Sequence, residues 1–345
     1  MMFKWKVVNI LVCIVLMLAA IVIPTQASVP EVQVPTGFYK VKSDDGVILY
    51  RKDYPGGNPD FVQVIDLNLG ASVQLLRGEI TDKRAGQGVY GGDDPRIQSK
   101  SLNQFWKEIN SESGEVFCVT NGLFFLMGES PTRFPFPLKI NNEIISDGYG
   151  KNEHADQKLM LEVWDDKAEI RPFSQQVLYS SSAPNIIVGL TEDARKSPTK
   201  YLARTFVGID DHNGDSRYET ILIFSTRTSR QKDAARVLRD FGADKVIMLD
   251  GGGSTQLICQ GKTYISSDRK IPQAIAVISA VEGQTSSPVL SLFGFDTSAN
   301  TGQSSSLDSV DPVGNLFDLK WIFLTMVLIA LVLVIIIGRS RQGYY

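Results

Sequence analysis

The sequence contains few of the residues from which metal and nucleophilic sites are most often built. Its 345 residues include 3 cysteines and 2 histidines, and these form no cysteine–histidine cluster of the kind that binds zinc. An excess of basic residues is also missing, since the formal net charge is −3, so we expect no nucleic-acid partner. Residues 28–318 contain no Asn-x-Ser/Thr acceptor for glycosylation, which favours a bacterial cell surface over a eukaryotic lumen.

An apolar run near the start of the chain predicts a targeting segment. Lys4 and Lys6 precede this run, and small residues lead up to Ala27. The pattern predicts a secretory signal peptide over residues 1–27 that is cleaved after Ala27, with an uncleaved N-terminal anchor as the alternative.

A second apolar run predicts a transmembrane helix over residues 319–338. No charged residue lies between Trp321 and Gly338, and a helix of this length extends for about 27 Å, close to the thickness of the hydrocarbon core. The basic residues that follow favour a cytoplasmic tail over 339–345 and argue against a GPI signal. We therefore expect a single-pass cell-membrane protein that contacts the lipid bilayer through its C-terminal helix and holds its main domain outside the cytoplasm.

Residues 28–282 are expected to form a single α+β domain with a large mixed β-sheet and few helices. Short apolar segments bounded by glycine and proline predict many strands, and residues 101–110 and 230–241 have the pattern of helices. We expect Ser229 to cap the second of these helices. Residues 283–318 are rich in serine, threonine, glycine and proline and predict a flexible stalk.

Two cysteines remain once the N-terminal segment, which contains Cys13, is removed: Cys118 and Cys259. In an exported protein they could form a disulfide, or they could be two small buried apolar side chains. Both interpretations stay open because the sequence does not set the distance between the two residues.

An acidic segment, residues 210–215, lies between two predicted strands. Its sequence, Asp-Asp-His-Asn-Gly-Asp, has some likeness to a calcium-binding loop. The spacing is too short and the glutamate at the twelfth position is missing, so a plain hairpin tip is the favoured interpretation.

The most informative segment is a strand that ends in Asp250 and is followed directly by Gly251, Gly252, Gly253 and Ser254. Consecutive glycines permit positive φ and the close approach of a ligand or a second backbone. An aspartate beside such a turn suits a site where backbone N–H groups meet an anion. The alternative is a tight hairpin turn with an incidental aspartate.

Two further strands carry residues poorly suited to plain packing. One leads into Asn121 and Gly122, with aromatic residues up to Phe125 close behind, and the other opens with Arg204. Arginine offers a planar fork that suits phosphate, although a salt bridge is its alternative role. Together with Asp250, these residues would suit a sugar phosphate. Arg204 and the glycine N–H groups would bind the phosphate, Asn121 would bind a sugar hydroxyl, and Asp250 would act at the acetal carbon or the leaving oxygen.

The order and spacing of these segments resemble the phosphodiester glycosidase family. That family has an Asn-Gly-Gly-Phe-Phe segment, an Arg-Thr-x-x-Gly segment, a helix closing in Leu-Gly-Ala, and Leu-Asp-Gly-Gly-Gly-Ser. The corresponding segments here are residues 121–125, 204–208, 241–243 and 249–254, with weaker matches at 64–67, 137–142 and 269–276. The chain departs from the family at Leu123, where a second glycine is usual, and this departure could reshape the sugar pocket.

The resemblance implies hydrolysis of a glycosyl-1-phosphodiester in a surface or envelope glycan, so the expected partner is a sugar-phosphate or polysaccharide substrate. It assigns catalysis to Asp250, Arg204 and Asn121. It assigns substrate binding to a second set of residues: Gly122, Phe125, Gly251, Gly252, Gly253, Ser254 and Asp66. The alternative is a non-catalytic polysaccharide-binding protein or exopolysaccharide assembly factor that keeps the same pocket.

Glycosidases commonly use two carboxyl groups, and the sequence identifies only Asp250. Asp66, Asp147 and Glu162 are candidates for the second, with Asp66 in the strand context that best matches the family, and His154 is a candidate acid or base. Each of them has a structural or solvated role as its alternative. No cofactor is assigned. A divalent metal that bridges Asp250 and the phosphate stays open, because the sequence supplies no metal-ligand set.

Overall fold

The computed structural model describes residues 32–113 and 115–280, which lie within the first of two compact units of the chain, Met1–Ser286. The predicted signal peptide, stalk, transmembrane helix and cytoplasmic tail fall outside the described residues. Among the residues that are described, no helix is both long enough and apolar enough to span a membrane.

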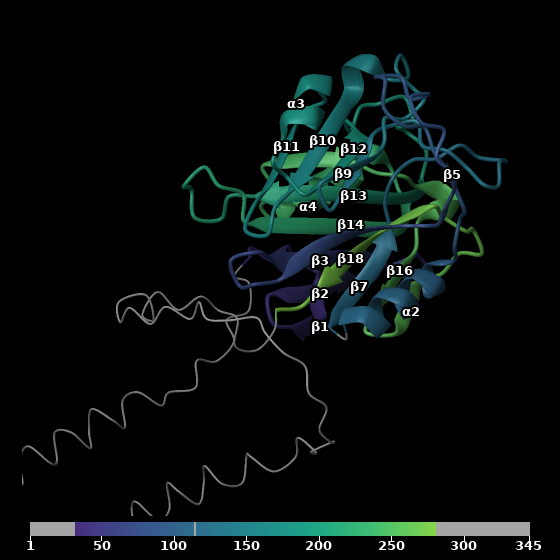
Figure 1. The fold of residues 1–345 in the computed structure, drawn as a ribbon. Coiled ribbons are helices and arrows are strands. Elements are labelled where there is room, and N and C mark those ends of the chain that lie inside the picture. The colour runs from purple at the N-terminus through teal and green to yellow at the C-terminus, as the bar shows by residue number, and fades with distance from the viewer. Residues whose placement is uncertain (1–31, 114, 281–345) are drawn as a thin grey trace, which may run out of the picture. The chain divides into compact units, whose positions relative to one another are not determined.

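Two antiparallel sheets form most of the domain (Figure 1). The larger has 11 strands in the order β1-β2-β3-β14-β13-β15-β12-β10-β11, with β8 paired to β12 and β9 paired to β8. Its strands are β1 (Tyr39–Asp44), β2 (Val47–Lys52), β3 (Asp60–Asp66), β8 (Leu138–Ile140), β9 (Glu143–Ser146), β10 (Lys158–Val163), β11 (Ala168–Pro172), β12 (Asn185–Leu190), β13 (Leu202–Asp210), β14 (Thr220–Ser229) and β15 (Lys245–Met248).

The smaller sheet has 5 strands in the order β17-β16-β7-β18-β4. Its strands are β4 (Ser72–Arg77), β7 (Val116–Asn121), β16 (Leu257–Cys259), β17 (Lys262–Ile265) and β18 (Gln273–Ile278). A separate pair of short strands is formed by β5 (Ile80–Asp82) and β6 (Arg96–Ile97).

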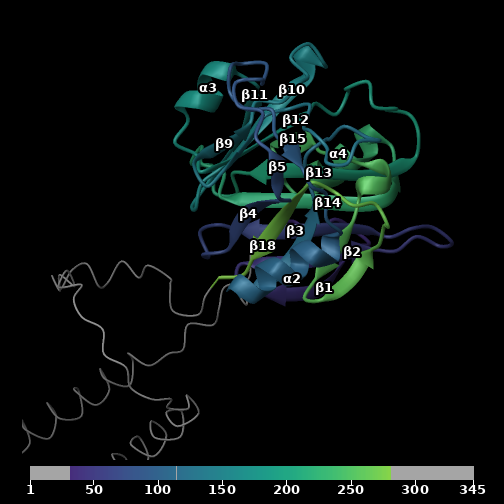
Figure 2. The same cartoon turned by 45° about the vertical axis from the view of Figure 1, so that its right-hand side comes forward.

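The described residues also form three α-helices and two 3-10 turns: α2 (Leu102–Ser113), α3 (Gln175–Ser180), α4 (Gln231–Asp240), η1 (Ala155–Gln157) and η2 (Gly252–Ser254). Helix α2 lies on the outer face of the smaller sheet (Figure 2). Its Phe105 and Ile109 are buried in a hydrophobic cluster with residues of that sheet. Helix α4 packs on β13 and β14, where Gly208 leaves room, since a Cβ there would lie 2.7 Å from the Cβ of Ala243.

The main hydrophobic core extends over both faces of the larger sheet. It includes Phe117 and Ile275 from the smaller sheet, Val207 and Ile223 from the larger, and Leu238 from α4. Successive side chains of a strand point to opposite faces. The face of β13 and β14 opposite to α4 therefore meets the smaller sheet. The layers are, in order, α2, the smaller sheet, the larger sheet and α4.

The prediction of an α+β domain with a large sheet and few helices is confirmed in this coarser form, and every strand pairing among the described residues is antiparallel. The predicted cap of α4 is wrong. Arg230 is the N-cap, without a side-chain cap, because the Ser229 hydroxyl donates instead to the carbonyl of Arg230 at 3.0 Å. Cys118 and Cys259 form a disulfide, since they lie directly opposite each other on β7 and β16.

Candidate active site

The glycine turn connects the two sheets, because it leaves β15 of the larger sheet and enters β16 of the smaller one. Each glycine meets a different requirement. A Cβ on Gly251 would lie 2.7 Å from the carbonyl oxygen of Ala203. Gly252 has a φ of +61°, which favours glycine. A Cβ on Gly253 would lie 2.7 Å from the guanidinium carbon of Arg269. The run of glycines therefore brings a strand end, a neighbouring backbone and an arginine together.

The main chain of Asp250 is fixed by the end of β7. Its N–H donates to the carbonyl of Gly122 at 2.9 Å, and its carbonyl accepts a hydrogen bond from Nδ2 of Asn121 at 2.7 Å. The smaller sheet thus holds Asp250, which lies just after β15 of the larger sheet. This attachment restricts where the carboxylate can lie.

The residue Asp250 is half-buried, and two cations lie near enough for their charges to act on its carboxyl group. The Ser254 hydroxyl and the Gly251 N–H hydrogen-bond to it, and the positive charges of Arg269 and Lys196 favour its ionised form. Burial acts in the opposite direction and is the larger effect, so the pKa of Asp250 is raised to about 6. A carboxyl group with this pKa can change its protonation state near neutral pH, which is common at catalytic sites.

Both cations are held in place by neighbouring groups. Nη1 of Arg269 donates to the Ser254 hydroxyl at 3.2 Å. The exposed Lys196 places its Nζ 5.2 Å from the ring centroid of Phe124, a cation–π arrangement that favours one position of the ammonium group. The phenyl ring is itself buried against Phe136, with 5.7 Å between ring centroids.

Arg204 was predicted to bind phosphate, and the structure contradicts this role. Its guanidinium group donates to the carbonyls of Lys196, Ser197, Lys200 and Ser229 and to the side chain of Gln231. These bonds use all of the N–H donors that an arginine has. Burial also lowers the pKa of Arg204. The residue instead holds the segment that carries Lys196, so it acts on the site indirectly.

Asn121 was predicted to bind a sugar hydroxyl, but its amide is occupied by the protein. The side chain is 1% exposed. Its Oδ1 accepts hydrogen bonds from the Thr205 hydroxyl at 2.9 Å and from the N–H of Gln256 at 3.2 Å, while its Nδ2 binds the carbonyl of Asp250. Asn121 therefore joins three segments of the site and positions Asp250.

Gly122 and Phe125 were predicted to contact substrate, and in the structure both contact other residues of the protein. A Cβ on Gly122 would lie 2.0 Å from Oε1 of Gln273, and that oxygen accepts the N–H of Leu123 at 2.7 Å. Phe125 packs against the main hydrophobic core and against the cluster that contains Phe105 of α2. Leu123, where the chain departs from the family, is buried in the main core and fills space there.

Asp66 lies at the opposite end of the larger sheet from Asp250, which excludes its predicted role in binding substrate. The strand registers place Asp66 level with Asp210 across the sheet. Ile209, next to Asp210 in the chain, pairs with Lys245 at the start of β15. Asp250 follows five residues later, which is about 16 Å along a strand. The Asp66 carboxylate instead accepts two backbone N–H groups of the turn that follows it.

The remaining candidates have partners elsewhere. Asp147 is buried and accepts a hydrogen bond from the Tyr179 hydroxyl at 2.6 Å. Glu162 is buried and forms an ion pair with Arg171 at 2.6 Å. His154 precedes η1 in a left-handed backbone conformation. None of the three is among the groups that shift the pKa of Asp250.

Sequence reasoning missed the two cations beside Asp250. Arg269 opens the weakly matching segment 269–276, so a signal for it was present. Lys196 lies in a polar connection between β12 and β13, where no pattern distinguishes it from its neighbours.

A pocket of about 450 Å³ opens beside the glycine turn. Gly252 and Gly253 line one part of it, and Arg227 and Asp268 line another. Its volume lies in the range of small-molecule sites, so a sugar or its aglycone could be accommodated next to the turn.

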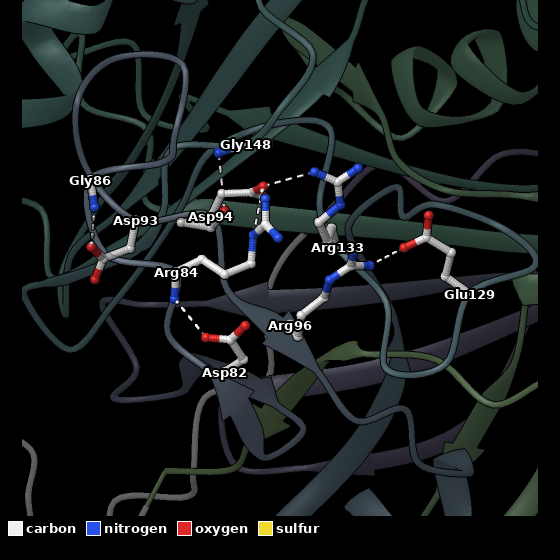
Figure 3. Close-up of polar contacts among 10 residues, drawn as sticks. Asp82, Arg84, Gly86, Asp93, Asp94, Arg96, Glu129, Arg133 and Gly148 are labelled. Carbon is white, nitrogen blue, oxygen red and sulfur yellow. Dashed lines mark hydrogen bonds and ion pairs between the residues drawn. The ribbon is translucent and has the colours of Figure 1, made fainter.

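A second pocket, of about 470 Å³, lies where β5 and β6 meet residues 129–131. The arginines around it are paired with carboxylates, as Figure 3 shows. Arg133 donates to Asp94 at 2.8 Å, and Arg96 pairs with Glu129. Because each of these positive charges has a negative partner, this region does not favour an anionic ligand.

No metal-ligand set lies at Asp250. Among residues 32–113 and 115–280, the one group of three or more acidic side chains close enough to share a metal ion consists of Asp211, Asp215 and Glu219. This group lies at the other end of the larger sheet, beside Asp210. A metal that bridges Asp250 and phosphate therefore finds no support in the geometry.

Residues 116–278 match a family model described as phosphodiester glycosidase. The resemblance inferred from the sequence motifs is confirmed over this part of the chain. No curated protein sequence matches the chain.

Two solved structures are similar to the chain at low identity. A hypothetical protein from Synechocystis is 11% identical with a TM-score of 0.45, covering 71% of this chain, and this chain spans less than two thirds of it, 64%. The zebrafish N-acetylglucosamine-1-phosphodiester alpha-N-acetylglucosaminidase catalytic domain, auto-inhibited by its pro-peptide, is 14% identical with a TM-score of 0.45, covering 74% of this chain and 87% of that one. Similarity at this level does not assign an activity.

Proposed function

Because residues 116–278 match the phosphodiester glycosidase family, we propose that this chain hydrolyses a glycosyl-1-phosphodiester. The observation that carries the proposal is the position of Asp250, a half-buried residue before the glycine turn, whose pKa burial raises to about 6 and on whose carboxyl group the charges of Arg269 and Lys196 act. The two cations supply the charge that a phosphate group needs, and the carboxylate supplies the group that acts on the sugar carbon.

The reaction breaks the bond between C1 of the sugar and the phosphate oxygen, and the electron pair leaves with the phosphate. A phosphate ester is weakly basic, so its departure does not require the strong acid that an alkoxide leaving group needs. Arg269 and Lys196 stabilise the negative charge that develops on it. This accounts for a site with one carboxylate and two cations.

Ionised Asp250 has two ways to complete the step. It attacks C1 directly, and water then hydrolyses the glycosyl ester, or it takes a proton from the water that attacks C1. In both cases water supplies the hydroxyl group of the free sugar. The ionised form of Asp250 is the active one in both routes.

The test is a turnover assay on a panel of α- and β-glycosyl-1-phosphodiesters, run with and without a chelator. We expect release of free sugar, and a decrease of at least about 10³-fold in kcat/KM for Asp250→Asn with an unchanged circular dichroism spectrum. Asp240→Asn makes the same change of charge at an exposed position of α4 and should leave the rate unchanged. Normal turnover by Asp250→Asn would refute the assignment, and binding without turnover would favour the non-catalytic alternative.

We further propose that the domain acts outside the cytoplasm on a surface or envelope glycan and is tethered by residues 319–338. The apolar runs of the sequence support this location, as does the Cys118–Cys259 disulfide, since disulfides persist in oxidising compartments. Cell fractionation tests the tether. The full chain should sediment with membranes, and a chain that ends at residue 318 should not. Equal sedimentation of the two chains would contradict the tether.

A further inference from the structure

The loop between β13 and β14 brings carboxylates together at the end of the larger sheet. Asp211, Asp215 and Glu219 each present an oxygen atom within 4.8 Å of the others. Negative charges this close repel one another unless a cation lies between them. Arg217, in the same loop, pairs with Asp166 at 2.6 Å, so its charge is not directed at the three carboxylates. Asp211 and Asp215 accept hydrogen bonds from backbone N–H groups of the loop, which supply no positive charge.

Glu219 independently indicates a missing ligand. Its side chain is 4% exposed, and its Oε2 has no hydrogen-bond partner among the described residues. A buried carboxylate oxygen without a donor is costly, so such atoms are rare in folded proteins. The main chain of Glu219 is anchored, because its carbonyl accepts the N–H of Leu67 at 2.9 Å.

The spacing of the oxygen-bearing residues follows that of a calcium loop over its first nine positions. If Asp211 is the first position, Asn213 is the third, Asp215 the fifth and Glu219 the ninth, and these positions carry ligands in such loops. Gly214 has a φ of +73°, which allows the chain to reverse between them. The sequence favoured a plain hairpin tip because the spacing within residues 210–215 is too short and position twelve lacks a glutamate. The fold places Glu219 against the same group.

We propose that Asp211, Asp215 and Glu219, together with the Asn213 side chain, bind one calcium ion. The acidic donors and the amide oxygen are all hard oxygen ligands. Calcium accepts six to eight such ligands in irregular geometry, whereas magnesium requires a nearly ideal octahedron, which a loop of this kind does not supply. The ion would neutralise the three carboxylates and fix the β13–β14 connection. The proposal is independent of the proposed hydrolase activity.

The direct test is calorimetric titration of the full-length chain, treated with a chelator and then dialysed, with CaCl2 and separately with MgCl2. We expect one calcium ion per chain, and at least tenfold weaker binding of magnesium. Glu219→Gln and Asp215→Asn should each weaken calcium binding at least tenfold, while Asp156→Asn, an exposed change of equal charge in η1, should not. Asp215 is exposed, so its variant tests the site even if Glu219→Gln fails to fold.

Thermal unfolding adds a second test, because the order of the two melting temperatures should reverse between chelator and calcium. In chelator, Glu219→Gln should melt at a higher temperature than the unmodified chain, because it removes an uncompensated buried charge. In excess calcium the order should reverse, because only the unmodified chain is stabilised by the ion. No saturable binding up to about 10 mM calcium, ten times the weakest affinity usual for such loops, would overturn the proposal. Calcium binding that is unchanged in both variants, or magnesium binding of equal strength, would overturn it as well.

Discussion

The two ends of the larger sheet place carboxylates in opposite electrostatic surroundings. At the glycine turn, the charges of Arg269 and Lys196 act on Asp250, and Arg227 and Asp268 line the pocket beside it. At the β13–β14 loop, Asp211, Asp215 and Glu219 converge. The first place has a surplus of positive charge and suits an anionic substrate, while the second has a surplus of negative charge and suits a cation. The local balance of charge, rather than the presence of an aspartate, distinguishes the two functions.

The largest expected effect comes from removing a positive charge beside the glycine turn. We expect Arg269→Gln to lower kcat/KM for a glycosyl-1-phosphodiester by about 10²–10³-fold, because it removes a donor to the leaving phosphate. Arg236→Gln, which changes a surface arginine of α4, is the matched control and should leave kcat/KM unchanged. A rate close to that of the unmodified chain in Arg269→Gln would show that the phosphate does not lie there.

The pH dependence tests the state of Asp250. Its pKa of about 6 predicts that kcat/KM rises nearly tenfold per pH unit below 6 and levels off above it, because the ionised form is active. Arg269→Gln should move this transition to higher pH, since it removes a charge that favours ionisation. The profile is measured from pH 5 to 8 in buffers of constant ionic strength. A flat profile would contradict a catalytic role for a group that titrates in this range.

The same pKa has the opposite effect on stability. A carboxyl group whose pKa is raised by folding stabilises the folded state most at low pH, and that contribution is lost as pH rises from about 4 through about 6. Asp250→Asn should therefore be more stable than the unmodified chain above pH 6 and similar to it near pH 4. Denaturant unfolding at both pH values measures this. A variant that is less stable at pH 7 would contradict the expectation.

Arg204 offers a more moderate test, because it acts through the segment that carries Lys196. Arg204→Gln should lower the free energy of unfolding by about 2–4 kcal/mol, since buried carbonyl groups lose their donors, and should lower kcat/KM about tenfold. In a Lys196→Gln background the same change should have little further effect on the rate, as expected for residues that act as one unit. An additive loss of rate would indicate a direct role for Arg204.

The smallest expected effects come from a matched pair of glycines. Gly252 in the turn and Gly214 in the loop both have positive φ, and a Cβ at either position would meet nothing within 4 Å. Replacing either with alanine should therefore cost about 1 kcal/mol of stability through backbone strain alone. Only Gly252→Ala should lower the rate, and only Gly214→Ala should weaken calcium binding. Equal effects of both variants on rate and on calcium binding would remove the distinction between the two ends.

Local pattern was sufficient to predict much of the fold. The strands around Val47 and Phe61 and the helix that starts near Ser101 follow from apolar periodicity and turn residues. The glycine run likewise identified the turn at Asp250, because consecutive glycines after a strand are a distinctive local pattern, although Gly251 and Gly253 are required by the distant Ala203 and Arg269. The strands and the helix depend on neighbours in sequence, so local pattern predicts them.

The roles of single polar residues were harder to predict because they depend on distant partners. Arg204 had the right chemistry for phosphate, yet its donors are used by the segment around Lys196 and by the start of α4. Asp66 had a matching strand context, but the strand registers put it at the end of the sheet opposite to Asp250. No pattern along the chain indicates which donors are already occupied, and that information decided both cases.

The path of the glycine turn has a consequence for how activity fails. The chain leaves the larger sheet at Asp250, which is held by Asn121 of the smaller sheet, and then enters the smaller sheet. Asp250 therefore keeps its position only while the two sheets are packed together. A loss of docking that leaves both hydrogen-bonded ladders intact would abolish the proposed turnover before circular dichroism registers any change. The rate of the proposed reaction would therefore report whether the two sheets are packed together.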